Sequence, residues 1–341
     1  SDWDAYETSW DFTTLPLLSP DHRGETLEVT YARLRAHWQG MTDEMQRLEE
    51  ENNRIFIDAY GLQDELTPEV PIEEITLTCN PAYSIKGDMT DETREARLRE
   101  RTMKEFISYA VGCMFGRYSL DAPGLILANQ GDTLQDYLAR VPDPSFTPDA
   151  DNIIPVLGND RFEDDAYVRF RTYLSRTFGA ERLDENLAFI REALGRDVRD
   201  HLSRKFFDEH SDRYKKRPIY WMISSPKGAF QALIYMHRYG PDTLNTVLTR
   251  YVRPLRDRLE AAVRDVEVEQ IAAGASTAQR NKAGNEIDRL NKQITELTDW
   301  ERDHLYPMAL QRIEIDLDDG VKRNYPLFNG VMKPVKGLSD G

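Results

Sequence analysis

Apolar residues spaced at alternating steps of four and three constrain the fold of this 341-residue chain most strongly. The first such run consists of Leu27, Tyr31, Leu34, Trp38, Met41, Met45 and Leu48, and Ile55 and Ala59 extend it. This spacing places the apolar side chains along one side of a helix, where they form the seam that packs against a neighbouring element. It predicts one long helix over residues 25–60, which ends at Gly61.

Two further runs near the end of the chain predict a helical hairpin. In the first run, apolar residues at helical spacing cover residues 244–266, and the predicted helix ends at Gly274. In the second run, apolar residues repeat in strict four-three steps over residues 283–297. Ser276, between them, begins a sequence with the spacing of a capping box, which starts a helix. Two helices with so short a connection fold back on each other, so we expect an antiparallel hairpin over residues 242–312.

The remaining patterns predict shorter elements. Helices are expected over residues 90–115 with Thr90 as the N-cap, over 161–178, 181–195 and 197–207, and through Phe230, Leu233, Ile234 and His237. Strands are expected over residues 70–79 and 218–223. After Asp316-Leu-Asp-Asp-Gly320 we expect an irregular tail that lies against another part of the chain.

These elements indicate a mainly α fold, a helical bundle with long antiparallel helical hairpins and a few short β-strands. Residues 141–160 contain four prolines and several turn formers. We therefore place a junction at residues 142–160, between an N-terminal helical region (1–141) and a helical domain (161–341).

Composition restricts the function. The formal net charge of −16 opposes non-specific attraction to a polyanion, so any contact with nucleic acid must be local. No apolar run is long enough to span a membrane, and the acidic, aromatic start of the chain lacks the features of a signal peptide, which indicates a cytoplasmic location. The two cysteines, Cys79 and Cys113, are expected to be buried thiols, and no metal site is expected.

The segment 75–83, ITLTCNPAY, is superficially similar to the catalytic tetrapeptide of DNA adenine methyltransferases, in which Asn or Asp and an aromatic ring hold a flipped adenine. Ala82 stands where a second proline is expected. Such enzymes also need a glycine-rich turn for S-adenosylmethionine before this motif, and the preceding residues form mostly one long helix. We therefore predict that the segment is a strand that ends in an Asn-Pro turn.

Other catalytic patterns are missing from the sequence. Ser224 and Ser225 lie outside any Gly-x-Ser-x-Gly motif, and no phosphate-binding loop occurs. The six histidines show no metal-ligand spacing, and His237 is expected to be a hydrogen-bonded core residue. No catalytic, cofactor-binding or metal-binding residue is predicted.

Six basic residues are interleaved with aromatic residues between positions 204 and 221 of this acidic chain. Positive side chains can neutralise phosphates, so we consider the following residues as candidates for DNA contact: Arg204, Lys205, Arg213, Lys215, Lys216, Arg217 and Lys227. In the alternative interpretation, the basic residues are a solvated rim that pairs with Asp208, Glu209 and Asp212. The aromatic residues Phe206, Phe207, Tyr220 and Trp221 are expected to belong to the core.

Several long phrases, in order, resemble one family. They are residues 6–12 (YETSWDF), 53–62 (NRIFIDAYGL), 65–70 (ELTPEV), 107–121 (ISYAVGCMFGRYSLD), 216–221 (KRPIYW), 235–239 (YMHRY) and 324–328 (NYPLF). Together they are similar to the carboxy-terminal part of PglX, the adenine-specific DNA methyltransferase of bacterial BREX phage-defence systems.

The resemblance implies that a catalytic domain lies upstream and that the intact protein methylates N6 of adenine with S-adenosylmethionine. The start at Ser1 without methionine also suggests a piece of a longer protein. This chain, with no cofactor of its own, would then support engagement of double-stranded DNA or recognition of the target. Alternatively, it is a helical protein-interaction module that docks the upstream methyltransferase domain or other BREX components and never touches DNA.

Overall fold

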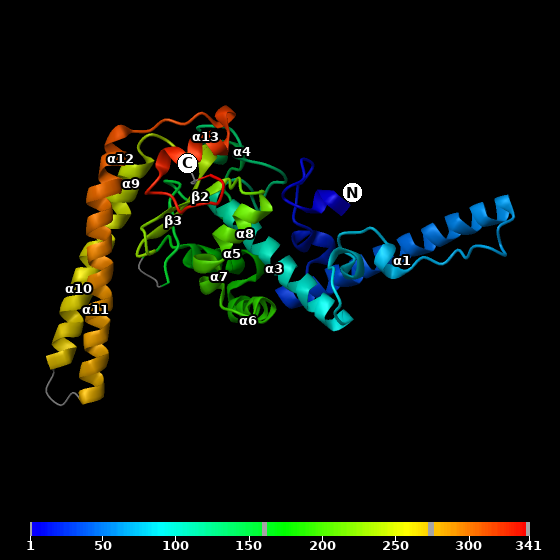
Figure 1. Ribbon diagram of the computed structural model, residues 1–341, viewed down its shortest axis with the longest axis horizontal. Coiled ribbons are helices and arrows are strands. Elements are labelled where there is room, and N and C mark those ends of the chain that lie inside the picture. Colours follow the sequence, from blue (N-terminus) through cyan, green and yellow to red (C-terminus); the bar gives the residue numbers. More distant parts are fainter. Residues whose placement is uncertain (1, 159–161, 272–275, 339–341) are drawn as a thin grey trace. The chain divides into compact units, whose positions relative to one another are not determined.

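The computed structural model describes residues 2–158, 162–271 and 276–338. It is mainly helical with one small sheet, which confirms the predicted fold class (Figure 1). Packing divides the chain into two compact units, residues 1–110 with 171–198 and residues 111–170 with 199–341. The proposed junction at 142–160 lies within the second unit, so a domain boundary at that place stays a prediction.

The first unit is built around the long helix α1. Its helices are α1 (Leu27–Tyr60), α2 (Pro81–Ser84), most of α3 (Asp91–Phe115), the second half of α5 (Ala166–Phe178) and α6 (Leu183–Leu194). The side chain of Thr26 accepts a hydrogen bond from the N–H of Val29 and begins α1, and Gly61 ends it with a left-handed φ of 67°. The predicted helix over residues 25–60 is therefore confirmed.

Only the first two-thirds of the α1 stripe is covered within its unit. The N–H of Leu27 donates to the side-chain oxygen of Asn186 at 2.8 Å, and Tyr31 contacts the ring of Phe189 on α6. Trp38, Met41 and Met45 pack on the buried residues Ile75, Leu77 and Cys79. Beyond them the predicted stripe reaches solvent, since Leu48 is 46% exposed and Ile55 is 60% exposed.

The predicted strand over residues 70–79 is wrong. The segment contains a 3₁₀ turn, Ile72–Glu74, followed by extended and turning residues that pair with no strand in the described part of the chain. Its alternation is real, because Ile75, Leu77 and Cys79 point into one apolar cluster. Alternation alone did not reveal that the neighbour is the side of a helix, which offers no backbone partners for a ladder.

The second unit combines a small sheet with short helices and a long hairpin. Its elements are α4 (Leu134–Arg140), β1 (Ile154–Pro155), the start of α5, α7 (Val198–Arg204), α8 (Phe206–Arg213), β2 (Tyr220–Ser224), β3 (Gln231–Tyr235), α9 (Thr243–Thr246), α10 (Arg253–Ile271), α11 (Thr277–Trp300), α12 (Tyr306–Gln311) and α13 (Val321–Asn324). The strands pair antiparallel in the order β1-β3-β2, with Trp221 opposite Ile234. The predicted strand at 218–223 is confirmed as β2, and the predicted helix at 181–195 is confirmed as α6 of the first unit. The predicted helix at 197–207 is present as α7, but it ends at Arg204, and α8 begins at Phe206.

The predicted helix through Phe230, Leu233, Ile234 and His237 is wrong, because most of this segment is strand β3. Ala232 to Tyr235 are all buried, so the strand shows no alternation of apolar and polar residues, and such a continuous apolar run does not distinguish a buried strand from a buried helix. A turn at Pro226–Gly228, in which Gly228 has a φ of 77°, joins it to β2 as a hairpin. His237 lies in a 3₁₀ turn, Met236–Arg238, that follows β3.

The predicted helical hairpin is confirmed, and α10 and α11 lie side by side (Figure 1). The predicted connection and Gly274 lie outside the described residues, but the Ser276–Gln279 capping box at the start of α11 is present. Both arms contain a π-helical segment near the base, Val247–Val252 and Glu301–Leu305. There the carboxylate of Glu301 bridges Arg253 and Arg256 at 2.8 and 2.9 Å.

The tail after residue 316 is irregular, with short helical turns, and it lies against β2 as expected. Ser224 donates its N–H to the carbonyl of Val331, and Lys333 donates its N–H to the carbonyl of Met222. The ring of Trp221 contacts Tyr325 and Phe328. The tail therefore covers the outer edge of β2 and part of its face.

Candidate nucleic-acid interface

Three consecutive basic residues, Lys215, Lys216 and Arg217, form the turn between α8 and β2. The N–H of Lys215 donates to the carbonyl of Asp212 and that of Lys216 to the carbonyl of Ser211. Lys215 and Lys216 have φ angles of 53° and 62°, a left-handed conformation that costs a side-chain-bearing residue about 1–2 kcal/mol. The chain thus keeps long basic side chains where glycine would be less strained.

His210 fixes this turn to the sheet. Its Nε2 accepts hydrogen bonds from the backbone N–H groups of Ile219 and Tyr220, both at 3.1 Å. The ring is buried and stacks on Phe206 and Tyr220. Burial, helped by the charges of Arg213 and Arg117, holds the pKa of His210 well below its ordinary value. The imidazole is therefore neutral at physiological pH and serves as a backbone acceptor.

The candidate basic residues of this segment lie mostly at the surface. Arg204, Lys205, Lys215, Lys216 and Arg217 are exposed, whereas Arg213 is half-buried at the end of α8. Arg204 pairs with Asp200 at 2.9 Å and Lys216 pairs with Asp212, so these two charges are partly compensated. Lys205, Lys215 and Arg217 make no ion pair with the residues that the structure describes.

The aromatic residues of the segment belong to the core, as predicted. Phe206, Phe207, Tyr220 and Trp221 are each exposed by 3% or less. These rings cannot stack on bases, so any contact with a nucleic acid would rely on the charged side chains.

Lys333 is a basic neighbour that the sequence did not reveal. The tail carries it to α8, where its ammonium group pairs with Asp208 at 2.7 Å and lies 5.2 Å from the ring centre of Phe207. More than one hundred residues separate Lys333 from α8 in the chain, and no local pattern indicates the contact.

Lys227 is separated from the other candidates. It lies in the β2–β3 turn, at the opposite end of β2 from Lys215–Arg217. The length of this five-residue strand, about 17 Å, separates the two positions. Lys227 lines an open groove of about 540 Å³ along α11, together with Asp288, Glu296, Asp299 and Asp303. One carboxylate oxygen of Glu296 accepts hydrogen bonds from the Lys227 N–H and the Ser225 hydroxyl. The structure does not bring Lys227 together with the basic turn.

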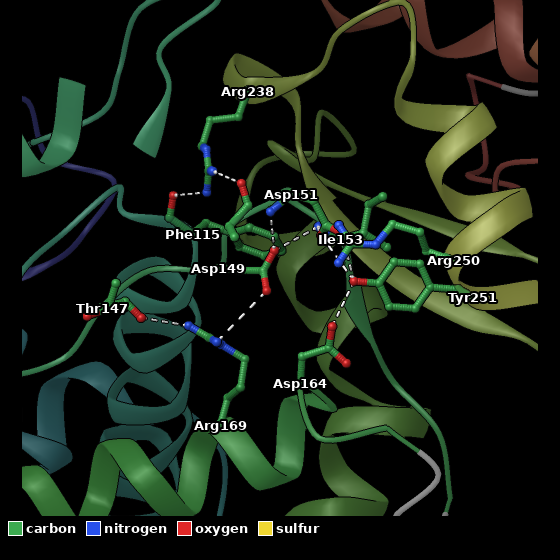
Figure 2. A network of polar contacts seen from close by, with 11 residues as sticks. Phe115, Thr147, Asp149, Asp151, Ile153, Asp164, Arg169, Arg238, Arg250 and Tyr251 are labelled. Carbon is green, nitrogen blue, oxygen red and sulfur yellow. Dashed lines mark hydrogen bonds and ion pairs between the residues drawn. The ribbon is translucent and has the colours of Figure 1, made fainter. Parts of the chain in front are cut away.

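A polar network holds the segment that leads into β1 (Figure 2). One side-chain oxygen of Asp149 accepts from the N–H groups of Asp151 and Ile153, and its other oxygen lies 3.8 Å from the guanidinium of Arg169. Burial raises the pKa of Asp149 to about 7, an effect larger than the opposing influence of Arg169. The carboxyl group is thus engaged in holding a turn of the backbone.

The same network reaches the π-helical segment before α10. The hydroxyl of Tyr251 donates toward Asp151 and Asp164, and it lies 2.7 Å from a carboxylate oxygen of Asp164. Arg250 pairs with Asp151 at 2.8 Å (Figure 2). These contacts join the residues before β1 to the base of the helical hairpin, which is a structural role.

The side chain of Asn80, in the ITLTCNPAY segment, forms hydrogen bonds with nearby backbone groups. Its side-chain oxygen accepts from the N–H of Ala82 and caps α2, and its amide donates to the carbonyls of Ile72 and Ile75. Asn80 is buried, so its amide is not available to hold an adenine. The predicted Asn-Pro turn is therefore held by the Asn80 side chain, which has a structural role. The predicted strand before this turn is absent from the described residues 70–79.

Residues 2–158, 162–271 and 276–338 contain neither a candidate metal site nor a helix suited to cross a membrane. No group of three or more His, Cys, Asp or Glu side chains there is arranged to hold a metal ion, and none of the helices has the length and apolar character needed to cross a bilayer. Cys79 and Cys113 are buried free thiols, as predicted.

Comparison with known proteins gave close relatives. The chain is 37% identical over 339 residues to the adenine-specific methyltransferase PglX of Lacticaseibacillus casei (strain Zhang), a match that covers 95% of this chain and 26% of the relative. It is 36% identical over 354 residues to the adenine-specific methyltransferase BrxX of Escherichia coli O9:H4 (strain HS), covering 99% of this chain and 29% of the relative. No family model matches the chain.

Proposed function

Because this chain belongs to the PglX and BrxX family of adenine-specific methyltransferases, we propose that it is a non-catalytic region that helps such an enzyme hold its target DNA. The chain spans between a quarter and a third of the length of these relatives. The intact protein would use S-adenosylmethionine to methylate adenine in DNA and mark host DNA in a phage-defence system. The catalytic site would lie outside this chain, upstream of it.

The basic turn at Lys215–Arg217 carries the proposal. Lys215 and Arg217 are exposed and unpaired among the described residues, and His210 and the left-handed backbone fix the turn that presents them. Cations held in place on a rigid turn lose little entropy when they meet a phosphate, and each phosphate contact releases counterions from DNA. Lys205, at the start of α8, adds a further exposed cation.

The net charge of −16 limits this contact to a small area. Asp208 and Asp212 lie on α8, the helix that ends just before the basic turn, but each already pairs with a lysine, Lys333 and Lys216 respectively. The local charge is therefore less negative than that of the whole chain. A contact of this kind positions a duplex without reading its bases.

A charge-reversal variant tests the proposal. Changing Lys215, Lys216 and Arg217 to Glu lowers the formal net charge by six, from −16 to −22. A matched control makes the same change at three exposed residues of α11, Arg280, Lys282 and Lys292. Binding of the chain to a labelled duplex at low salt should fall at least about tenfold in the first variant and much less in the control, which carries the same net charge. Equal losses in both variants would contradict a specific role of the turn.

A further inference from the structure

The end of α1 exposes large apolar side chains that its own unit does not cover. Ile55 is 60% exposed, Phe56 54% and Tyr60 73%, and Leu66 in the following segment is 53% exposed. The rings of Phe56 and Tyr60 stack on each other, with centroids 6.5 Å apart. We call these residues the α1 tip. Four large apolar side chains that are more than half exposed within residues 55–66 indicate a contact with another molecule or domain.

The α1 tip is an ordered structure. The chain turns back after Gly61 and runs along α1, where Gln46 donates to the carbonyl of Val70 at 2.7 Å and Asn53 donates to the carbonyl of Pro68 at 3.2 Å. Glu50 accepts from the N–H of Val70. These contacts fix the returning segment, so the exposed rings are presented on a defined support and little flexibility would be lost on binding.

The charge around the α1 tip excludes nucleic acid and selects a basic protein surface. Residues 49–69 contain seven acidic residues, Glu49, Glu50, Glu51, Asp58, Asp64, Glu65 and Glu69, and one basic residue, Arg54. Only Glu51 among these acids has an ion pair with a residue outside this range that the structure describes, Arg47 at 2.8 Å, so six acidic charges remain against that of Arg54. Such an acidic rim repels phosphates. An apolar centre within an acidic rim is complementary to an apolar socket bordered by lysine and arginine.

We propose that the α1 tip docks onto the remainder of the methyltransferase polypeptide, through an apolar socket with a basic border. The relatives show that this remainder is large, because the chain corresponds to only 26% and 29% of their lengths. A partner in the same polypeptide is present at high effective concentration, so a contact of a few side chains is sufficient to hold it. The proposal rests on family membership and is independent of DNA binding.

Thiol labelling of the intact methyltransferase that contains this chain tests the contact. Tyr60→Cys and Phe56→Cys each place one thiol in the α1 tip, and the native Cys79 and Cys113 are buried and contribute little background. Ile271→Cys, at a position 79% exposed at the end of α10, is the matched control. The rate of alkylation by iodoacetamide is measured for each variant in the intact protein and in this chain alone.

The expected result is that the α1 tip thiols react at least about tenfold more slowly in the intact protein, whereas the control thiol reacts at the same rate in both. Equal rates for the tip thiols in the two proteins would overturn the proposal. So would a rate that falls with increasing concentration of the chain alone, because a second copy would then be the occupant. Raising the salt concentration should weaken the protection, since the rim interaction is electrostatic.

Discussion

The Nε2 atom of His210 lies 3.1 Å from the backbone nitrogen of Tyr220, and this contact joins the end of α8 to the start of β2. The same atom accepts the N–H of Ile219. One neutral imidazole therefore satisfies two backbone donors at the point where the chain leaves the basic turn. The position of Lys215–Arg217 depends on a buried residue that itself bears no charge.

Replacing His210 by Ala should destabilise the second unit by about 2–4 kcal/mol, because it leaves two buried N–H groups without an acceptor and opens a cavity among aromatic rings. Urea unfolding followed by tryptophan fluorescence measures the change. His37→Ala, on the exposed side of α1, is the control and should alter the free energy of unfolding by less than about 0.5 kcal/mol. A neutral His210→Ala variant would show that the imidazole does not hold the turn.

The raised pKa of Asp149 predicts a dependence of stability on pH. Since the folded protein holds a proton on this carboxyl up to about pH 7, it binds more protons than the unfolded chain between the ordinary carboxyl pKa, about 4, and that value. The contribution to stability is complete at the acid end of this window and is lost as the pH rises to about 7. The melting temperature, measured at several pH values, should show this decline.

Asp149→Asn should flatten that part of the pH profile, because the amide keeps an oxygen that can accept from the N–H groups of Asp151 and Ile153 but carries no titrating proton. Asp257→Asn, at an exposed position of α10, should leave the profile unchanged. A wild-type profile that rises between pH 5 and pH 7 by an amount sensitive to Asp149→Asn would show that the sign of the pKa shift is wrong.

Two glycines in helices should respond in opposite directions to alanine. A Cβ on Gly112 in α3 would lie 2.4 Å from a ring carbon of Tyr118, so Gly112→Ala should cost about 1–3 kcal/mol of stability. Gly40 in α1 has open space around it, and Gly40→Ala should stabilise the helix by about 0.5–1 kcal/mol. Thermal unfolding of the two variants measures both effects, and a stabilising Gly112→Ala would contradict the close packing of Tyr118.

The helical part of the fold could be predicted from the sequence because its signals are local. The four-three spacing of apolar residues located α1, α10 and α11, and Thr26, Gly61 and Ser276 lie at helix ends where their side chains or backbone act as caps. Strand β3 was missed because both of its faces are buried, which removes the alternation that marks a strand. Ile75, Leu77 and Cys79 showed alternation without a strand, since a helix side covers them.

The candidate interface was predictable only in part. The basic residues at 204–217 could be recognised from composition, and the burial of their aromatic neighbours followed from hydrophobicity. Lys333 lies beside these basic residues because the tail pairs with β2, a contact that the sequence does not reveal. Lys227 lies apart from them because the length of β2 separates it from the basic turn. The role of His210 could not be predicted from the sequence. It accepts from backbone N–H groups nine and ten residues away, which only the folded turn brings next to its ring.

The salt dependence of duplex binding tests whether the turn at Lys215–Arg217 contacts the phosphates of DNA. The observed association constant of the chain for a labelled duplex is measured across a salt series, with single-stranded DNA as the control, for the wild type and for the variant with Glu at 215, 216 and 217. Duplex binding should weaken with salt, and the slope of log K against log salt should be smaller in the variant by about 1.8, or about 0.9 for each phosphate contact of the two cations, Lys215 and Arg217, that are unpaired among the described residues. An unchanged slope, or no binding by the wild type at low salt, would contradict a role of this turn in holding DNA.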